Sequence, residues 1–436
     1  MTQVISIGLN ELDFGLLEQY TMDGTLPTFR ALLDQHDLMT TIAEHEQHQL
    51  EPWIQWVTVH TGLRFEQHQV FRLGDIVATD HPQIWEILEQ RFGLRVGAIS
   101  PMNARNSLSS PAFFMPDPWT KTRVDGSWDL KLLTQAIIQA VNDNAHAKVS
   151  IRSQVALLLG LLLNAAPINY RRYAQLLFTS KQAKWGRALF LDQLLTDVFI
   201  RNVRRSRPDY ASLFLNAGAH IQHNYLFSSK YYQGPLRNPE WYLPAGFDPI
   251  ADVYRLYDRL ISQIRSAFPK ARILLCTGLS QKPNHDLISF YRPKEHAELL
   301  RALGIDTFVA VEPRMSRDFL VTFGSGDAAA QAQQQLASFV APDGSPIFTV
   351  DNRGLSLFCM LAYTGYIDKG FGIKNSEKVL PDFDQWVSHV NIENGVHQAE
   401  GFFMDTGKPK TGQTACIPLE RVFQLTVDMF SPQVSG

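Results

Sequence analysis

The chain has 436 residues, of which 45% are hydrophobic and 19% are charged, with a formal net charge of −3. This composition is typical of a folded protein and excludes a disordered chain, and the absence of a long basic run argues against nucleic acid as the main partner. A chain of this length exceeds one compact core, so we expect a large α/β domain with an insertion, or two domains.

The N-terminal sequence MTQVISIGLNELDFG has neither a basic start nor a long apolar core, so we expect no signal peptide there. Residues 4–9 form a short apolar run that stops at the polar pair Asn10 and Glu11. This pattern is typical of a buried strand with polar groups at its carboxyl end. In open α/β sheets, ligands bind at that edge.

Strands and helices alternate along much of the remaining chain. Apolar runs predict further strands at 95–99, 212–215 and 272–276. Helical periodicity predicts helices at 26–38 and 84–91, and a closing helix at 417–430. This alternation indicates a mostly parallel central sheet with helices on both faces.

Strand signals disappear between residues 121 and 207, where helices are expected at 130–141, 153–163 and 188–203. We interpret 121–207 as a helical insertion, or cap, on a core formed by 1–120 and 208–436. Its most apolar run, 155–166, is too short to span a bilayer, which needs about 20 residues. The basic end of the last helix is more typical of a solvated face than of an anion-binding site. It carries Arg201, Arg204, Arg205 and Arg207.

The three cysteines, Cys276, Cys359 and Cys416, are scattered and lack the spacing of metal ligands. Isolated cysteines suit a reducing compartment. We therefore expect a cytoplasmic protein.

Motifs occur in a fixed order at 7–13 with 23–29, and at 52–62, 214–223, 274–280 and 394–407. In this order they resemble the alkaline phosphatase superfamily, and within it the type I phosphodiesterase and nucleotide pyrophosphatase branch. The resemblance covers most of the chain except the helical insertion. It implies a three-layer α/β sandwich and an activity on phosphate or sulfate esters. In the family, two metal ions carry out that chemistry.

Several positions depart from the family's motifs. Asn10 stands at the first aspartate ligand, and Pro52 stands at the nucleophile. Gly278 and Leu279 stand at a later Asp-His pair of ligands. A neutral amide binds a divalent cation more weakly than a carboxylate does, and the other three side chains offer no ligand. One of the two metal sites is therefore not expected to form, and we do not expect the two-metal mechanism.

The other metal site retains histidines. His397 lies in the segment that matches the family best, and 214–223 fits the family's Asp-x-x-x-His motif in two registers. One register pairs Ala219 with His223, and the other pairs Asn216 with His220. The resemblance implies a single divalent ion, zinc or similar, with His223, His397 and His220 as its ligands. No nucleotide cofactor is expected.

Further polar side chains are expected at the same edge of the sheet. His60, Arg64 and His68 are candidate catalytic residues, because imidazoles transfer protons and guanidinium groups hold anions. Candidate substrate-binding residues share polar side chains that are expected at this edge of the sheet. They are Asn10, Glu51, Gln55 and Asn216, and Gln281 belongs to the same edge.

Two functions fit this pattern. The first is a divergent hydrolase or transferase acting on a phosphate- or sulfate-containing small molecule or a glycan precursor. The second is a catalytically inactive binding or scaffold protein, a pseudoenzyme, which the loss of the nucleophile favours. Metal content and turnover distinguish the two, and in both the expected partner is a small molecule, with no nucleic acid and no membrane span. Neither the substrate nor the oligomeric state follows from the sequence.

Overall fold

The computed structural model describes residues 3–145, 151–179, 183–313 and 317–431. Contacts divide the chain into two compact units. The larger unit contains 1–141, 149–283 and 395–436, and the smaller unit contains 284–394 together with 142–148. The sequence pattern had not separated 284–394 from the core.

The larger unit contains an eight-stranded sheet with the order β16-β2-β15-β6-β1-β5-β3-β4 in the described residues. Among these strands only β15 runs antiparallel to its neighbours. The four strands predicted from apolar runs are confirmed as β1, β3, β5 and β6, which pair in parallel. The strands are β1 (Val4–Leu9), β2 (Leu38–Ile42), β3 (Val96–Ile99), β4 (Phe113–Met115), β5 (Tyr210–Leu215), β6 (Arg272–Cys276), β15 (Glu400–Asp405) and β16 (Cys416–Pro418).

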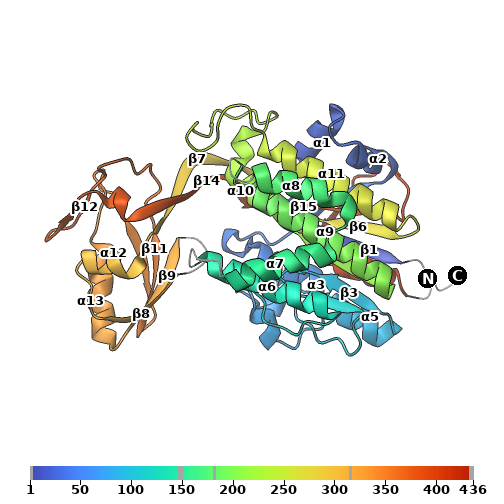
Figure 1. The fold of residues 1–436 in the computed structure, drawn as a ribbon, viewed down its shortest axis with the longest axis horizontal. Helices are drawn as coiled ribbons and strands as arrows, with labels where there is room; N and C mark the ends of the chain where they lie inside the picture. Colours follow the sequence, from blue (N-terminus) through green and yellow to red (C-terminus); the bar gives the residue numbers. More distant parts are fainter. Residues whose placement is uncertain (1–2, 146–150, 180–182, 314–316, 432–436) are drawn as a thin grey trace. The chain divides into compact units, whose positions relative to one another are not determined.

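Helices cover both faces of this sheet, so the α/β class with a mostly parallel sheet is confirmed (Figure 1). Ile5, Ile7 and Leu9 of β1 belong to the apolar core on one face, whereas Val4 belongs to the core on the other. This split follows from the alternation of side chains along a strand. The first core includes α1 (Phe14–Met22), α2 (Pro27–Gln35), α6 (Trp128–Ala145), α9 (Gly186–Ser206), α10 (Ala217–Tyr225) and α11 (Pro249–Ala267). The second includes α3 (Pro52–Thr61), α5 (Ile84–Phe92) and α14 (Arg421–Asp428).

The described residues of 128–206 are almost entirely helical. They form α6, α7 (Ile151–Asn164), α8 (Tyr170–Thr179) and α9, with a short 3-10 helix at Pro167–Asn169. Of these, α9 packs directly on β3 and β5 and so belongs to a layer of the sheet. The assignment of 121–207 as a separate insertion stays a prediction. In the described part of the chain, no helix has the length and hydropathy needed to cross a membrane.

The closing helix was predicted to start too early. Residues 416–418 form β16, which pairs in parallel with β2, and α14 begins at Arg421. Pro418 has no backbone N–H to donate within a helix, and proline is tolerated in an edge strand. The pairing of Ile417 with Thr41 therefore takes this segment into the sheet.

The smaller unit has its own apolar core around an antiparallel sheet with the order β10-β11-β9-β8. In β9, Phe319, Val321 and Phe323 are buried, and the residues between them are half-buried, as expected for a strand covered on one face. Its elements are β8 (Phe308–Pro313), β9 (Asp318–Phe323), β10 (Phe348–Asn352), β11 (Ser356–Leu361), β12 (Ile373–Lys374), β13 (Val379–Leu380), α12 (His296–Ala302) and α13 (Gly326–Ala337). A two-stranded ribbon, β7 (Ser280–Pro293) and β14 (Val387–Gln398), connects the two units along the chain.

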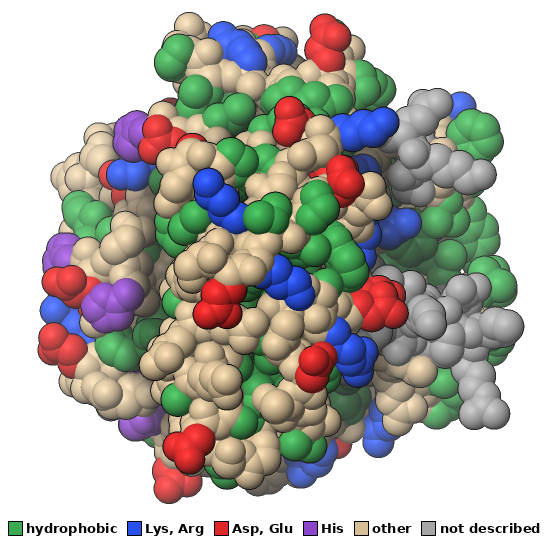
Figure 2. Space-filling view, turned by 90° about the vertical axis from the view of Figure 1, so that its left-hand side faces the viewer, with side chains coloured by type: hydrophobic (Ala, Val, Ile, Leu, Met, Phe, Trp, Pro, Cys, Tyr) green, Lys and Arg blue, Asp and Glu red, His purple; other side chains and the backbone are tan. Residues whose placement is uncertain are grey.

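Charge is evenly mixed on the surface that Figure 2 shows. Acidic and basic side chains are interspersed there with apolar ones, and neither sign gathers into a stripe. This face therefore lacks the basic stripe that typically tracks a nucleic-acid backbone.

Candidate metal centre

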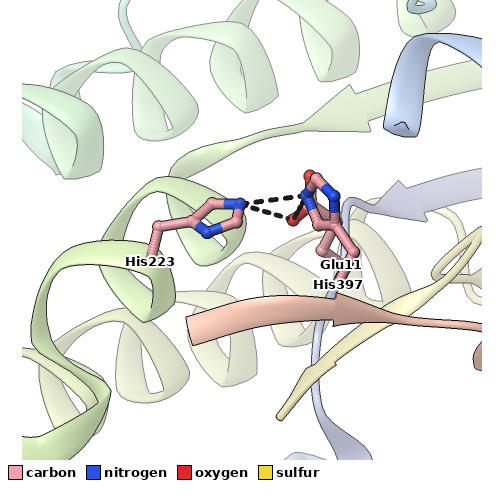
Figure 3. A group of neighbouring side chains, drawn as sticks. All are labelled: Glu11, His223 and His397. Carbon is pink, nitrogen blue, oxygen red and sulfur yellow. Dashed lines mark hydrogen bonds and ion pairs between the residues drawn. The ribbon is translucent and has the colours of Figure 1, made fainter. Parts of the chain in front are cut away.

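Three side chains from distant parts of the sequence converge on one point in the larger unit (Figure 3). Glu11 Oε2 lies 2.9 Å from His223 Nε2 and 3.0 Å from His397 Nε2. The two Nε2 atoms are 3.1 Å apart. Two imidazole nitrogens and one carboxylate oxygen thus form a nearly equilateral triangle of potential metal ligands.

The fold places these side chains from three different elements. Glu11 follows the carboxyl end of β1, His223 lies in the last turn of α10, and His397 lies near the end of β14. The backbone of Glu11 is in the left-handed region with φ of 57°, which is uncommon for a residue other than glycine. Its N–H donates to the Thr277 carbonyl at 3.0 Å, and its carbonyl accepts from Gln222 Nε2 at 2.7 Å. These bonds hold the backbone in that conformation.

The Glu11 carboxylate is buried and fully oriented. Asn10 Nδ2 donates to its Oε1 at 3.0 Å, and Gln281 Nε2 donates to its Oε2 at 2.6 Å. Burial alone raises the pKa of this carboxyl, but the facing His397 and His223 hold that pKa well below its usual range. Glu11 therefore carries a fixed negative charge at one corner of the triangle.

The hydrogen bonds of His223 fix which nitrogen carries its proton. His223 Nδ1 lies 2.8 Å from the Gly395 carbonyl, and a carbonyl only accepts, so Nδ1–H must donate. In a neutral His223, Nε2 then presents a lone pair toward the Glu11 oxygen and toward His397 Nε2. Such lone pairs repel one another unless a hydrogen on His397 Nε2 or a metal ion lies among them.

The geometry of the triangle fits a small transition-metal ion. Ligand atoms bonded to zinc at about 2.0–2.1 Å in a tetrahedron lie about 3.3–3.4 Å from one another. The observed separations of 2.9, 3.0 and 3.1 Å need only a slight spreading to reach that value. Two histidines and one glutamate are also a known ligand set of catalytic zinc sites, which leave one position open. The residues present therefore fit a single metal ion.

The positions that the sequence resemblance assigns to a second metal ion are packed around an indole ring. Trp56 is buried, and its Nε1–H donates to Asn10 Oδ1 at 2.7 Å. A side chain at Gly278 would meet the same indole at 3.2 Å. The indole ring therefore fills the space beside Asn10 and Gly278, and Leu279 is buried in the apolar core of that face.

The third donor of the triangle had not been expected from the sequence. His220, which was expected as a ligand, is exposed, and its ring contacts Asn224. Asn216 accepts from Asn10 Nδ2 at 2.7 Å and so belongs to the network behind Glu11. The donors that converge are Glu11, His223 and His397, and His220 is not among them. A ligand role for His220 stays a prediction. The sequence signal that could have identified this donor was the carboxylate of Glu11, which directly follows Asn10, the position that the resemblance assigns to a metal ligand.

The three candidate catalytic residues lie in or after α3. Buried His60 packs between Trp56 and Trp85, and burial lowers its pKa to about 3. His68 is buried, and its Nε2 lies 3.3 Å from Thr58 Oγ1. Burial is the main cause that lowers the pKa of His68 to about 4, and the electrostatic effect of His81 lowers it further. Exposed Arg64 pairs with Glu420 at 2.7 Å. These contacts join the three residues to groups outside the triangle, and a catalytic role for them stays a prediction.

Two candidate substrate-binding residues lie at the start of α3: Glu51 precedes the helix, and Gln55 lies in it. Glu51 Oε2 lies 3.8 Å from His397 Nδ1, so this partly exposed carboxylate stands at the rim of the triangle, behind the imidazole. Gln55 is buried and donates to the Gln49 carbonyl at 2.7 Å. Together with Arg64 it lines a cavity of about 240 Å³. For both residues, a contact with substrate stays a prediction.

A buried carboxylate positions the helix that carries His223. Asp192 of α9 accepts from the N–H groups of Ala217 at 2.8 Å and Asn216 at 3.3 Å, and from the Tyr257 hydroxyl at 2.8 Å. These donors include the first amide of α10, which has no partner inside the helix. Burial raises the pKa of Asp192 to about 6. Asp192 thus fixes the start of the helix on which His223 sits.

Comparisons with known proteins return likenesses of structure only. No family model and no curated protein sequence matches the chain. Phosphonoacetate hydrolase from Sinorhizobium meliloti 1021, in complex with phosphonoacetate, is 12% identical over 99% of this chain and 96% of that chain, with a TM-score of 0.43. Murine ectonucleotide pyrophosphatase/phosphodiesterase 5 in complex with AMP is 11% identical over 99% and 95%, with a TM-score of 0.42. The human protein of that name is 11% identical over 98% and 94%, with a TM-score of 0.42.

Proposed function

We propose that this chain is a divergent alkaline-phosphatase-like enzyme that acts on a phosphate- or sulfate-containing small molecule with the help of one metal ion. The ion would be held by Glu11, His223 and His397. One observation carries the proposal: Glu11 Oε2, His223 Nε2 and His397 Nε2 converge within 2.9–3.1 Å of one another. The two-metal mechanism is not part of it, because Trp56 fills the neighbouring space.

The chemistry of these residues supports such a role. A divalent ion, when bound, supplies Lewis-acid polarisation of a phosphoryl or sulfuryl oxygen and lowers the pKa of a water molecule. Glu11 supplies the negative charge, and Asn10 and Gln281 hold its carboxylate in place. The Gly395 carbonyl keeps the proton of His223 on Nδ1, so that Nε2 remains a ligand. Glu51 is placed to accept a proton at the rim of the triangle.

The alternative is a non-catalytic binding or scaffold protein. Two observations favour it: Pro52 stands where the family has its nucleophile, and the Trp56 indole fills the space beside Asn10 and Gly278. A chain that retains the triangle without turnover would use it to bind a metal or an anion, not to transform a substrate.

Turnover distinguishes the two. We expect zinc- or manganese-loaded protein to hydrolyse at least one of bis-p-nitrophenyl phosphate, p-nitrophenyl phosphate and p-nitrophenyl sulfate. The Glu11→Gln variant should lose that activity about 100-fold or more, because it removes the only charge among the three donors. Glu66→Gln, at an exposed position of the short helix Phe65–His68, is the matched control and should keep full activity. A rate that Glu11→Gln leaves unchanged contradicts the enzyme proposal, and no turnover with any of these ions favours the binding protein.

A further inference from the structure

A second cavity in the larger unit lies among α7, α9, α11 and the short helix Pro167–Asn169. Its volume is about 700 Å³, within the range of roughly 300–1,000 Å³ that is typical of small-molecule sites. Ala165, Ile200 and Ala267 supply apolar wall, and four arginines also line it. No residue of the metal centre lines this cavity.

The carboxylate in the wall of this cavity is engaged by neutral donors and is not shown in an ion pair with the described arginines of the cavity. Asp197 lines the wall, but its oxygens accept from neutral groups: the Ala166 amide at 2.8 Å, Asn169 Nδ2 at 2.7 Å and the Tyr173 hydroxyl at 2.8 Å. Among the four arginines, Arg201 pairs with Asp129 at 3.1 Å. The structure shows no carboxylate, in the residues it describes, that pairs with the other three. These are Arg204, Arg205 and Arg259.

Arg259 is the most constrained of these three. Its Nε is buried without a hydrogen-bond partner in the described structure, and the same holds for Nε of nearby Arg172. Burial is the main cause that lowers the pKa of Arg259 to about 10, and the positive charge of Arg172 is the second cause. Asp252 offsets part of the positive charge of Arg172, but Arg172 still acts unfavourably on Arg259, and a bound anion relieves that cost.

We propose that this cavity is a binding site for an organic phosphate, with the phosphate held by Arg259, Arg204 and Arg205. The apolar part of the ligand would lie against Ile200, Ala165 and Ala267. Guanidinium groups bind phosphate through paired hydrogen bonds, and a phosphate dianion matches several unpaired arginines better than a single carboxylate does. The site is separate from the proposed catalytic function, since its residues are different.

Calorimetric titration with hexylphosphonate, which has a stable C–P bond, tests the proposal, and hexanol is the neutral counterpart. Wild type should bind hexylphosphonate and not hexanol, and Arg259→Met should weaken the binding about tenfold or more. Arg265→Met, the same change on the same helix but outside the cavity lining, should leave binding unchanged. Glu11→Gln should also leave it unchanged, which separates this site from the metal centre.

A thermal melt guards against a folding artefact. Without ligand, Arg259→Met should melt at the same temperature as wild type or above it, because the change removes a buried, unpaired charge. Hexylphosphonate should raise the melting temperature of wild type but not of the variant. A wild type that does not bind hexylphosphonate overturns the proposal, as does a folded Arg259→Met that binds it as tightly. Additional binding to phosphatidic acid vesicles, lost in the same variant, would identify a lipid headgroup as the source of the phosphate.

Discussion

Replacing His397 by alanine is expected to abolish metal binding by the purified protein. Among the residues that the structure describes, the imidazole supplies one of the three donor atoms that converge, and Glu11 and His223 alone leave an ion with two of these ligands. Loss of a residue that merely supports a ligand typically costs 10–100-fold in affinity, so loss of a ligand should cost more than about 100-fold. Competition with a chromophoric zinc chelator measures this affinity directly.

The matched control for this variant is His285→Ala, which removes an exposed imidazole of the smaller unit. It should bind zinc as wild type does. If His397→Ala binds zinc with wild-type affinity, the triangle is not the metal site, and a hydrogen bond from an imidazole N–H accounts for its short distances. Circular dichroism of both variants verifies that each retains the fold.

Replacing Asp192 by alanine is expected to lower the free energy of unfolding by about 3–5 kcal/mol. The change leaves the Ala217 and Asn216 amides and the Tyr257 hydroxyl without their acceptor in a buried region, at roughly 1–3 kcal/mol for each unsatisfied group. Urea denaturation followed by circular dichroism measures the loss. Because α10 carries His223, zinc affinity should fall as well, and unchanged affinity in a folded variant would show that Asp192 does not position that helix.

The same carboxyl predicts a pH dependence of stability. Burial raises the pKa of Asp192 to about 6 in the folded state, above its value of about 3.9 in the unfolded chain. The folded state therefore keeps this proton to higher pH, and the contribution to stability falls as pH rises from about 4 through about 6. Relative to Asp192→Asn, which cannot ionise, wild type should lose on the order of 3 kcal/mol between pH 4 and pH 7. A difference that stays constant over this range contradicts the raised pKa.

The main sheet could be predicted from the sequence because its central strands are continuous apolar runs. Strands β1, β3, β5 and β6 are buried on both faces, and that burial requires apolar residues at successive positions. The smaller unit was not separated from the core, because its strands resemble core strands in sequence. In β9 and β11 buried residues alternate with half-buried ones, but Leu320, Phe358 and Met360 at half-buried positions are apolar as well, so the sequence does not show that one face of these strands is less covered.

Part of the candidate site could be predicted, and part could not. The closeness of His223 and His397 followed from a resemblance that assigned both to one metal ion, and the structure places their Nε2 atoms 3.1 Å apart. Glu11 was missed because the alignment of motifs put Asn10 at the ligand position. The backbone at Glu11, whose side chain lies in the site, is left-handed, and a sequence pattern does not reveal a single positive φ. The burial of His60 and His68 was not predicted, since a polar residue on a buried helix face is not visible as core in the sequence, and their catalytic role stays a prediction.

Anomalous X-ray diffraction at the zinc edge, from crystals of the full chain grown with zinc, tests the central claim most directly. We expect one strong peak per chain at the triangle, with bonds of about 2.0–2.2 Å to Glu11 Oε2, His223 Nε2 and His397 Nε2. The peak should be absent from crystals of His397→Ala grown in the same way. A zinc ion bound elsewhere while the triangle holds none, or a second ion beside Asn10 and Gly278, would contradict a single metal centre built on these three residues.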